Sequence, residues 1–410
     1  MIGSSAGPAP HLTTLTSVNL ASRLLGASVL AASDESFGEK ENLIVDAPAR
    51  FAPGKFGHKG EIVDGWETRR RGGTGQDWAV IRLGAPGVID QVDIDTSFFT
   101  GNFPPVCRLQ GCGVEGYPAT EKLRHDPSLW QDILGPTALH GDTHNIFDIE
   151  DRTRFTHLRL WIEPDGGVAR LRAYGTAIAD PIELTDLTVD LAARELGGRV
   201  IASSDAFYSS AESLNRPDRP RNMGEGWETQ RRRDGHHDWV ILALAAAGRP
   251  QIIEVDTSYF IHNASKHVEI YGIDAGGAAV PKRSDPGWFE VLPRTGLRAD
   301  TRHRFRVSDI PPVTHLLVEA FPDGGMARLR AYGVVDDAAR HEAAMRWFLS
   351  LPTSQAVAAL FDRAHLTYDK AVAVVESRPQ PATSASEWLR TLIFLDDSER
   401  KSLGTVLASD

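Results

Sequence analysis

Two short clusters of tryptophan, acidic and arginine side chains are the part of this chain best suited to chemistry. The first reads Gly-Trp-Glu-Thr-Arg-Arg-Arg over residues 65–71 and is followed by Asp-Trp at 77–78. Neighbouring arginines can hold a carboxylate through paired N–H bonds, which lysine does not reproduce. The two acids can serve as general bases or accept the N–H groups of a urea-like ligand. The pattern therefore predicts a small substrate that carries a carboxylate.

The same cluster occurs a second time. Trp66 returns as Trp227, 161 residues later, within Gly-Trp-Glu-Thr-Gln-Arg-Arg, and Asp-Trp returns at 238–239. At the same offset an Asp-Thr-Ser step and an asparagine also return. The candidate acid/base residues are Glu67, Asp77, Glu228 and Asp238. The candidate substrate-binding residues in these segments are Arg70, Arg71, Arg231, Arg232, Asn102 and Asn263. In the alternative interpretation each acid pairs with its own arginines and only fixes the shape of the loop.

A second motif is also duplicated. Pro-Asp-Gly-Gly-x-Ala-Arg-Leu-Arg-Ala-Tyr-Gly stands at 164–175 and again at 322–333. Glycine pairs allow a tight turn or a close backbone approach, which is more often structural than functional at the last strand of a sandwich. Arg170 and Arg328 nevertheless join the substrate-binding candidates.

Histidines give a weaker signal. His58, His236 and His237 show no metal-binding spacing such as His-Glu-x-x-His, so no metal ligands are assigned, although a divalent metal stays open. The chain also lacks a Walker loop, the Gly-x-x-x-x-Gly-Lys-Ser/Thr string that holds nucleotide phosphates. We expect no organic cofactor.

The duplication determines the expected architecture, because a repeat of this length indicates that the same folding unit occurs twice in the chain. Apolar residues alternate with polar ones around 92–95, 253–256 and 158–163, as in half-buried strands. The fold class is therefore mainly β, with two tandem jelly-roll β-sandwich domains. Expected boundaries are an N-terminal tail over 1–19, repeats over 20–180 and 181–335, and a helical C-terminal extension over 336–410. Helices are expected around Ala338–Leu349, Ser354–Ala364, Tyr368–Glu376 and Ser386–Phe394, packed on a sandwich or on another subunit.

Composition excludes several partners. The net charge of -11 argues against general binding to nucleic acid or to an anionic membrane surface. No apolar segment approaches the roughly 20 residues that cross a bilayer. With only Cys107 and Cys112 there is no disulfide framework, which predicts a reduced, cytoplasmic location. A homo-oligomer is compatible with the sequence.

Together, the two duplicated motifs and the Asp-Thr-Ser-x-Phe-x-x-Asn step resemble the allantoicase family over roughly residues 20–335. This resemblance implies two galactose-binding-like sandwiches and hydrolysis of allantoate to ureidoglycolate and urea, in the breakdown of purines through allantoin. It does not say which repeat holds the active site. Copy two lacks the glycine and prolines of Gly-Asn-Phe-Pro-Pro at 101–105. Two other functions stay open: a non-enzymatic binder of carbohydrate or another ligand, and a related ureide hydrolase, for instance one acting on ureidoglycolate.

Overall fold

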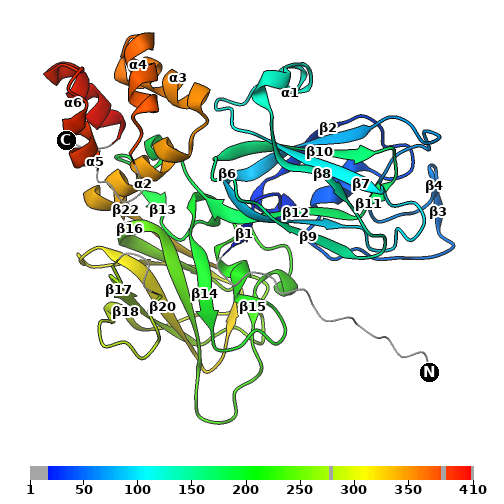
Figure 1. The fold of residues 1–410 in the computed structure, drawn as a ribbon. Helices are drawn as coiled ribbons and strands as arrows, with labels where there is room; N and C mark the ends of the chain where they lie inside the picture. The colour runs from blue at the N-terminus through cyan, green and yellow to red at the C-terminus, as the bar shows by residue number, and fades with distance from the viewer. Residues whose placement is uncertain (1–16, 277–279, 380–384, 408–410) are drawn as a thin grey trace.

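The computed structural model describes residues 17–276, 280–379 and 385–407. Each sequence repeat forms one eight-stranded antiparallel β-sandwich, and helices follow the second sandwich (Figure 1). The strands of repeat 1 are β1 Val18–Asn19, β2 Ser28–Ala32, β6 Asp77–Asp95, β7 Val106–Cys112, β8 Gln131–Ala138, β9 His144–Asp148, β10 Phe155–Glu163 and β12 Arg170–Ala177. Those of repeat 2 are β13 Val189–Asp190, β14 Arg199–Ser203, β16 Asp238–Asp256, β17 His267–Ile273, β18 Phe289–Gly296, β19 Arg302–Arg306, β20 Val313–Phe321 and β22 Arg328–Val335.

One long strand organises each sandwich. The first half of β6 pairs with β2 and β10, whereas its second half pairs with β9 and β12. The strand thus passes from one layer of the sandwich to the other, near Gly84-Ala-Pro-Gly87. Its 19 residues place Asp77 at one end and Asp95 at the other. Strand β16 repeats this arrangement in repeat 2.

The apolar side chains of the alternating segments meet between the layers. In repeat 1, Ile81, Ile94, Leu158 and Leu171 all belong to one buried cluster. Repeat 2 has an equivalent cluster of its own. The predicted fold class, mainly β with two tandem sandwiches and C-terminal helices, is confirmed, while the domain boundaries themselves stay predictions.

Separate two-stranded sheets accompany the eight-stranded sheet of each repeat. Strand β5, Trp66–Glu67, pairs with β11, Gly167–Val168. In repeat 2, β15, Trp227–Glu228, pairs with β21, Gly325–Met326. These pairs bring the two duplicated motifs of each repeat side by side. A further pair, β3 Phe56–Gly57 and β4 Gly60–Glu61, lies in the insertion of repeat 1.

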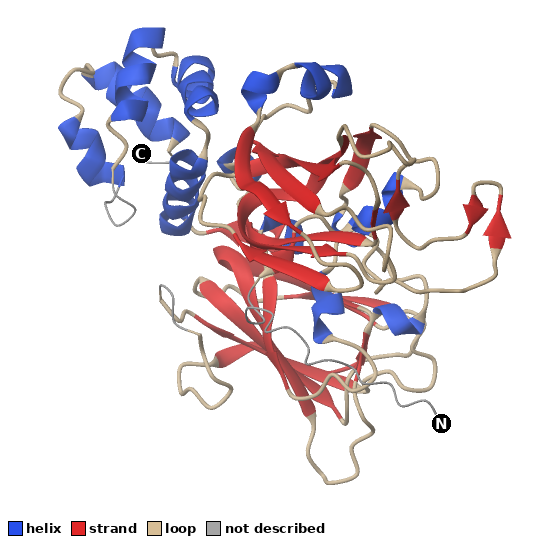
Figure 2. Ribbon diagram, turned by 45° about the vertical axis from the view of Figure 1, so that its right-hand side comes forward, coloured by secondary structure: helices blue, strands red, loops and turns tan. Residues whose placement is uncertain are grey.

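Helices gather at the C-terminal end of the chain, as Figure 2 shows in blue. The four predicted helices are present within a few residues of their expected bounds, and α6 was not predicted. The helices are α2 Asp337–Ser350, α3 Thr353–Ala364, α4 Tyr368–Glu376, α5 Ala385–Thr391 and α6 Asp397–Val406, and the short α1 Thr120–His125 lies in repeat 1. Helix α6 begins at a capping box in which Asp396 and Glu399 each accept the other's backbone N–H.

The helical extension contacts both repeats: Ala343 of α2 belongs to the buried cluster of repeat 2, and polar contacts join the extension to repeat 1. The guanidinium of Arg363 on α3 donates to both carboxylate oxygens of Asp180, at 2.8 and 2.5 Å. The backbone N–H of Arg154 donates to the carbonyl of Ser350. The extension therefore has both its own apolar core and a polar contact with the first sandwich. Within the described ranges, no helix is long and apolar enough to span a membrane.

Candidate functional site

Glu67 of β5 lies in a small cluster built by three separate segments. Its carboxylate accepts a hydrogen bond from the side-chain amide of Asn102 at 2.7 Å. The carbonyl of Asn102 accepts the backbone N–H of Gly167 at 2.8 Å, and Gly167 pairs with Glu67 across the two-stranded sheet. The two duplicated motifs and the asparagine loop therefore meet at this carboxylate.

The surroundings of Glu67 shift the pKa of its carboxyl. Burial raises the pKa of the carboxyl above its usual value, and the hydrogen bond from Asn102 and the charge of Arg70 only partly offset this effect. Arg70 itself is exposed and makes no hydrogen bond or ion pair with any described residue. Its five N–H donors are thus available to a ligand.

Asp77 is placed differently. Its fully buried carboxylate accepts two hydrogen bonds from Arg71, at 2.8 and 2.5 Å, and one from the hydroxyl of Ser33 at 2.6 Å. Burial favours the neutral acid, but the hydrogen bonds from Arg71, Ser33 and Thr68 outweigh it and lower the pKa of Asp77. Asp77 and Arg71 therefore pair with each other, as the alternative interpretation of the motif predicted.

Repeat 2 contains the same internal pair. Asp238 accepts hydrogen bonds from Arg232 at 2.9 and 2.6 Å and from the hydroxyl of Ser204 at 2.8 Å. As with Asp77, burial opposes ionisation but the hydrogen bonds prevail, so the pKa of Asp238 is lowered.

The arginines of the second motif also form hydrogen bonds within the protein. Arg170 is buried and donates to the backbone carbonyls of Ala47 and Asp64 and to the Asp64 carboxylate. Arg328 makes the corresponding bonds to Asp218 and Glu225. Both side chains tie the last strand to the preceding loop, and neither presents a free guanidinium.

Glu228 is the repeat 2 counterpart of Glu67. Its carboxylate accepts from the amide of Asn263 at 2.6 Å, but the same amide also lies 3.0 Å from the sulfur of Met223. Arg231 is exposed and makes no hydrogen bond or ion pair within the described part of the chain. The two Glu-Asn-Arg groups are therefore similar in geometry.

The histidines do not assemble a metal site in the described residues. The ring of His237 is 2.7 Å from the Glu319 carboxylate, which Arg283 also binds, while His58 and His236 are exposed. The acidic and histidine side chains close enough to share an ion, among those the structure describes, are the largely exposed Glu35, Glu39 and Glu41. Exposed acidic groups of this kind are common without any ion.

Two aromatic residues near the glutamates were missed by the sequence reasoning. Phe98 and Tyr259 occupy equivalent positions with φ of 70° and 68°, and their side chains are 47% and 46% exposed. A left-handed backbone at a bulky residue costs about 1–3 kcal/mol and tends to occur at functional sites. The available signal was the aromatic residue after Asp-Thr-Ser in both repeats.

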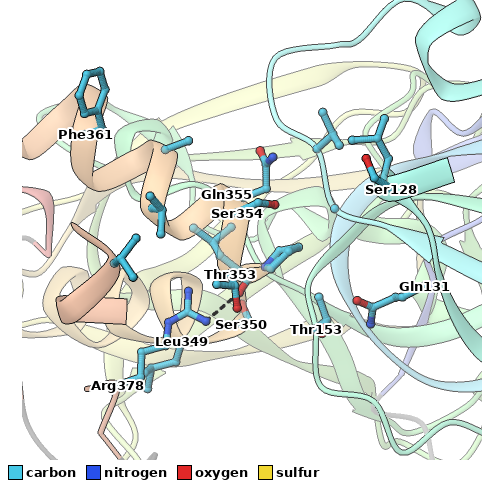
Figure 3. Close-up of a pocket in the computed structure, with 18 of the residues that line it drawn as sticks. Ser128, Gln131, Thr153, Leu349, Ser350, Thr353, Ser354, Gln355, Phe361 and Arg378 are labelled. Carbon is cyan, nitrogen blue, oxygen red and sulfur yellow. Dashed lines mark hydrogen bonds between the residues drawn. The ribbon is translucent and has the colours of Figure 1, made fainter. Parts of the chain in front are cut away.

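A cavity of about 1080 Å³ lies elsewhere, between repeat 1 and the C-terminal helices (Figure 3). Trp130, Gln355, Phe361 and Arg378 are among its lining residues, and Arg378 donates to the Leu351 carbonyl at 2.9 Å. None of the residues selected from the sequence lines it. This cavity is thus distinct from the Glu67 cluster.

Comparison with known proteins gives the family. A model described as the allantoicase repeat matches residues 18–178 and 189–336. A probable allantoicase of Streptomyces avermitilis is 46% identical over 328 residues, which cover 77% of this chain and 85% of that protein. One of Rhizobium meliloti is 43% identical over 330 residues, 78% of this chain and 94% of the relative. The crystal structure of the Saccharomyces cerevisiae allantoicase superposes with a TM-score of 0.67 at 30% identity, covering 77% of this chain and 93% of that one. The chain belongs to the allantoicase family.

Proposed function

We propose that this chain hydrolyses allantoate to ureidoglycolate and urea, and that the reaction takes place at Glu67, Asn102 and Arg70 of repeat 1. The observation that carries the assignment of the site is the Glu67 carboxylate. This carboxylate is partly buried, and burial raises its pKa. Its side-chain hydrogen bond comes from the amide of Asn102 at 2.7 Å, and the charge of Arg70, which has no described protein partner, acts on it. Carboxyls with a raised pKa in such positions are typical proton-transfer groups.

The chemistry of allantoate matches these groups. Its carboxylate suits the guanidinium of Arg70, which can bind two oxygens at once. Water adds to the central carbon as the bond to one ureido nitrogen breaks. Glu67 takes a proton from that water and returns it to the nitrogen of the departing urea. Asn102 holds the carboxylate in place for both transfers.

Repeat 1 is the better candidate of the two copies. Burial raises the pKa of Glu67, whereas in repeat 2 the sulfur of Met223 already lies against the amide of Asn263. Glu228, Asn263 and Arg231 are then a second, structural copy of the group. Asp77, Asp238, Arg71, Arg232, Arg170 and Arg328 are assigned structural roles, because each already has charged or backbone partners.

Location and assembly are part of the proposal. Cys107 and Cys112 are unpaired and buried, and burial raises the pKa of each thiol to about 12. Free cysteines fit a reducing cytoplasm. A homo-oligomer stays a prediction, which sedimentation or size-exclusion chromatography would test.

The first experiment measures urea release from allantoate and from ureidoglycolate by the purified protein, before and after chelator treatment. Faster release from allantoate supports the proposal, and faster release from ureidoglycolate makes the chain a different ureide hydrolase. Activity that the chelator abolishes and divalent ions restore would assign water activation to a metal instead of Glu67. Binding without any turnover would favour the non-enzymatic alternative.

A further inference from the structure

The loop that carries Asn102 also holds an exposed aromatic ring in a strained position. Phe98 has a left-handed backbone, which glycine adopts without steric cost. Repeat 2 has Tyr259 in the same conformation, 161 residues later. Both repeats therefore have an aromatic side chain at a position where the backbone conformation alone would favour glycine.

Specific contacts enforce this conformation. The backbone N–H of Phe98 donates to the Asp142 carboxylate at 2.7 Å, and that of Tyr259 donates to Asp300 at the same distance. Next in the chain, the ring of Phe99 is buried and packs directly on Gly65 and Gly167. Because Phe99 is anchored inside, the neighbouring ring of Phe98 is held at the surface.

That surface adjoins the Glu67 cluster. Gly167, on which Phe99 packs, is the strand partner of Glu67. Four residues beyond Phe98, Asn102 donates to the Glu67 carboxylate. Four residues of chain span at most about 14 Å, which is the upper limit on the distance between the backbones of Phe98 and Asn102.

Repeat 1 adds a second ring. Phe51, from the insertion that repeat 2 lacks, stacks on Phe98 with ring centroids 5.9 Å apart and planes 20° apart. Phe51 is also 51% exposed, so the pair is not part of the core. Within the described residues, Tyr259 has no such ring against it.

We propose that Phe98, supported by Phe51, is a substrate-contacting residue on whose ring a planar ureido group of the substrate stacks. The inference rests on the proposed function and names the surface that orients the ureido group beside Glu67. Planar π-systems attract one another in offset stacked arrangements, and a backbone that fixes the ring beforehand lowers the entropy lost on binding.

The test is Phe98→Gly, measured by urea release and thermal unfolding. Glycine relieves the left-handed strain, so we expect the Tm to be unchanged or higher. KM for allantoate should rise about three- to ten-fold, with a smaller change in kcat. Phe98→Leu, which keeps the bulk but not the π face, should show the same rise in KM. Phe98→Tyr should retain the wild-type KM.

Tyr259→Gly is the matched control, because it relieves the same strain in repeat 2. It should leave KM unchanged. Wild-type KM in Phe98→Gly and Phe98→Leu, alongside an inactive Glu67→Gln, would overturn the inference and leave the proposed function standing. A fully active Glu67→Gln would instead overturn the site assignment, whatever Phe98 does. If Phe98→Gly unfolds, the Leu and Tyr variants still decide the outcome.

Discussion

Glu67 and Asp77 belong to the same recurring motif but differ in what surrounds their carboxylates. Asp77 is fixed as an ion by Arg71 and Ser33, and its pKa is lowered despite burial. Glu67 has the amide of Asn102 as its side-chain donor, and burial keeps its pKa above the usual value. A group that exchanges its proton near the working pH transfers protons best. The contrast supports the proposed proton transfer at Glu67 and a structural role for Asp77.

The first prediction concerns activity. Glu67→Gln keeps the hydrogen bond from Asn102 but cannot accept a proton, so kcat/KM for allantoate should fall by about 10²–10⁴-fold. Glu228→Gln makes the same change in repeat 2 and should retain nearly full activity. Urea release measured on both variants decides between the copies, and the reverse pattern would move the active site to repeat 2.

The second prediction is a gain in stability in the same variant. Because the folded-state pKa of Glu67 is raised, the stability it contributes is fully present below its unfolded pKa and is lost as pH rises through the folded pKa. The ionised carboxylate therefore destabilises the folded protein at pH 7. Glu67→Gln should have a higher Tm than the wild type at pH 7, and the difference should vanish near pH 4. Calorimetry at both pH values checks this, and a lower Tm at pH 7 would contradict it.

The third prediction concerns Asp77, whose pKa is lowered where that of Glu67 is raised. Its lowered pKa means that its contribution is present above its unfolded pKa and is lost as pH falls through the folded value. Asp77→Asn leaves the partly exposed Arg71 without its partner, so we expect a loss of about 2–3 kcal/mol at pH 7. Denaturant unfolding at pH 7 and pH 3 should show the loss shrinking at the lower pH. An equal loss at both would indicate a packing effect.

At the scale of strands and loops, the period of the apolar residues predicts where strands lie in the sequence but not which strands pair. Alternation of apolar residues was enough to place strands around 92–95 and 158–163, whereas the duplicated motif offered Glu67 and Asp77 alike as candidates. The pairing of Glu67 with Gly167 joins segments a hundred residues apart, which no local pattern encodes. For the same reason the sequence could not distinguish Glu67, which is bonded to the amide of Asn102, from Asp77, which is paired with Arg71.

The fourth prediction uses this pairing. A Cβ at Gly167 would lie 1.9 Å from the ring of Phe99, a contact that the buried ring can relieve only by displacing the loop that ends at Asn102. Gly167→Ala should therefore lose about 1–3 kcal/mol of stability and much of its urea release. Gly135→Ala, in strand β8 with nothing within 4 Å of the added methyl, should behave as wild type. An active and stable Gly167→Ala would show that the loop does not depend on this close approach.

At the scale of the whole molecule, the chain combines a duplicated sandwich with an addition outside the family match. The match ends at residue 336, and helix α2 begins at Asp337. Four helices could be predicted because each presents an amphipathic pattern of its own. Their contacts with the sandwiches could not be predicted, because residues that meet there are far apart in the chain: Asp180 and Arg363 are separated by 183 residues.

The last prediction tests whether the extension opens independently of the sandwich. Arg363→Met keeps the aliphatic stem but removes the paired hydrogen bonds to Asp180. The guanidinium is about one-third exposed, with 34% of its side chain accessible, so we expect a loss of only about 1–2 kcal/mol. Hydrogen exchange in α3 and α4 should accelerate about five- to thirty-fold, while β6 and β10 exchange as in the wild type.

Lys401→Met is the control, since this exposed side chain on α6 has no ion pair with a described residue. It should leave exchange unchanged throughout. Because the Glu67 cluster lies in the sandwich and not in the extension, urea release by Arg363→Met should also match the wild type. Faster exchange in β6 and β10 together with the helices would mean that the extension and repeat 1 unfold as one unit. The ion pair would then stabilise the sandwich itself and not only the contact between the two.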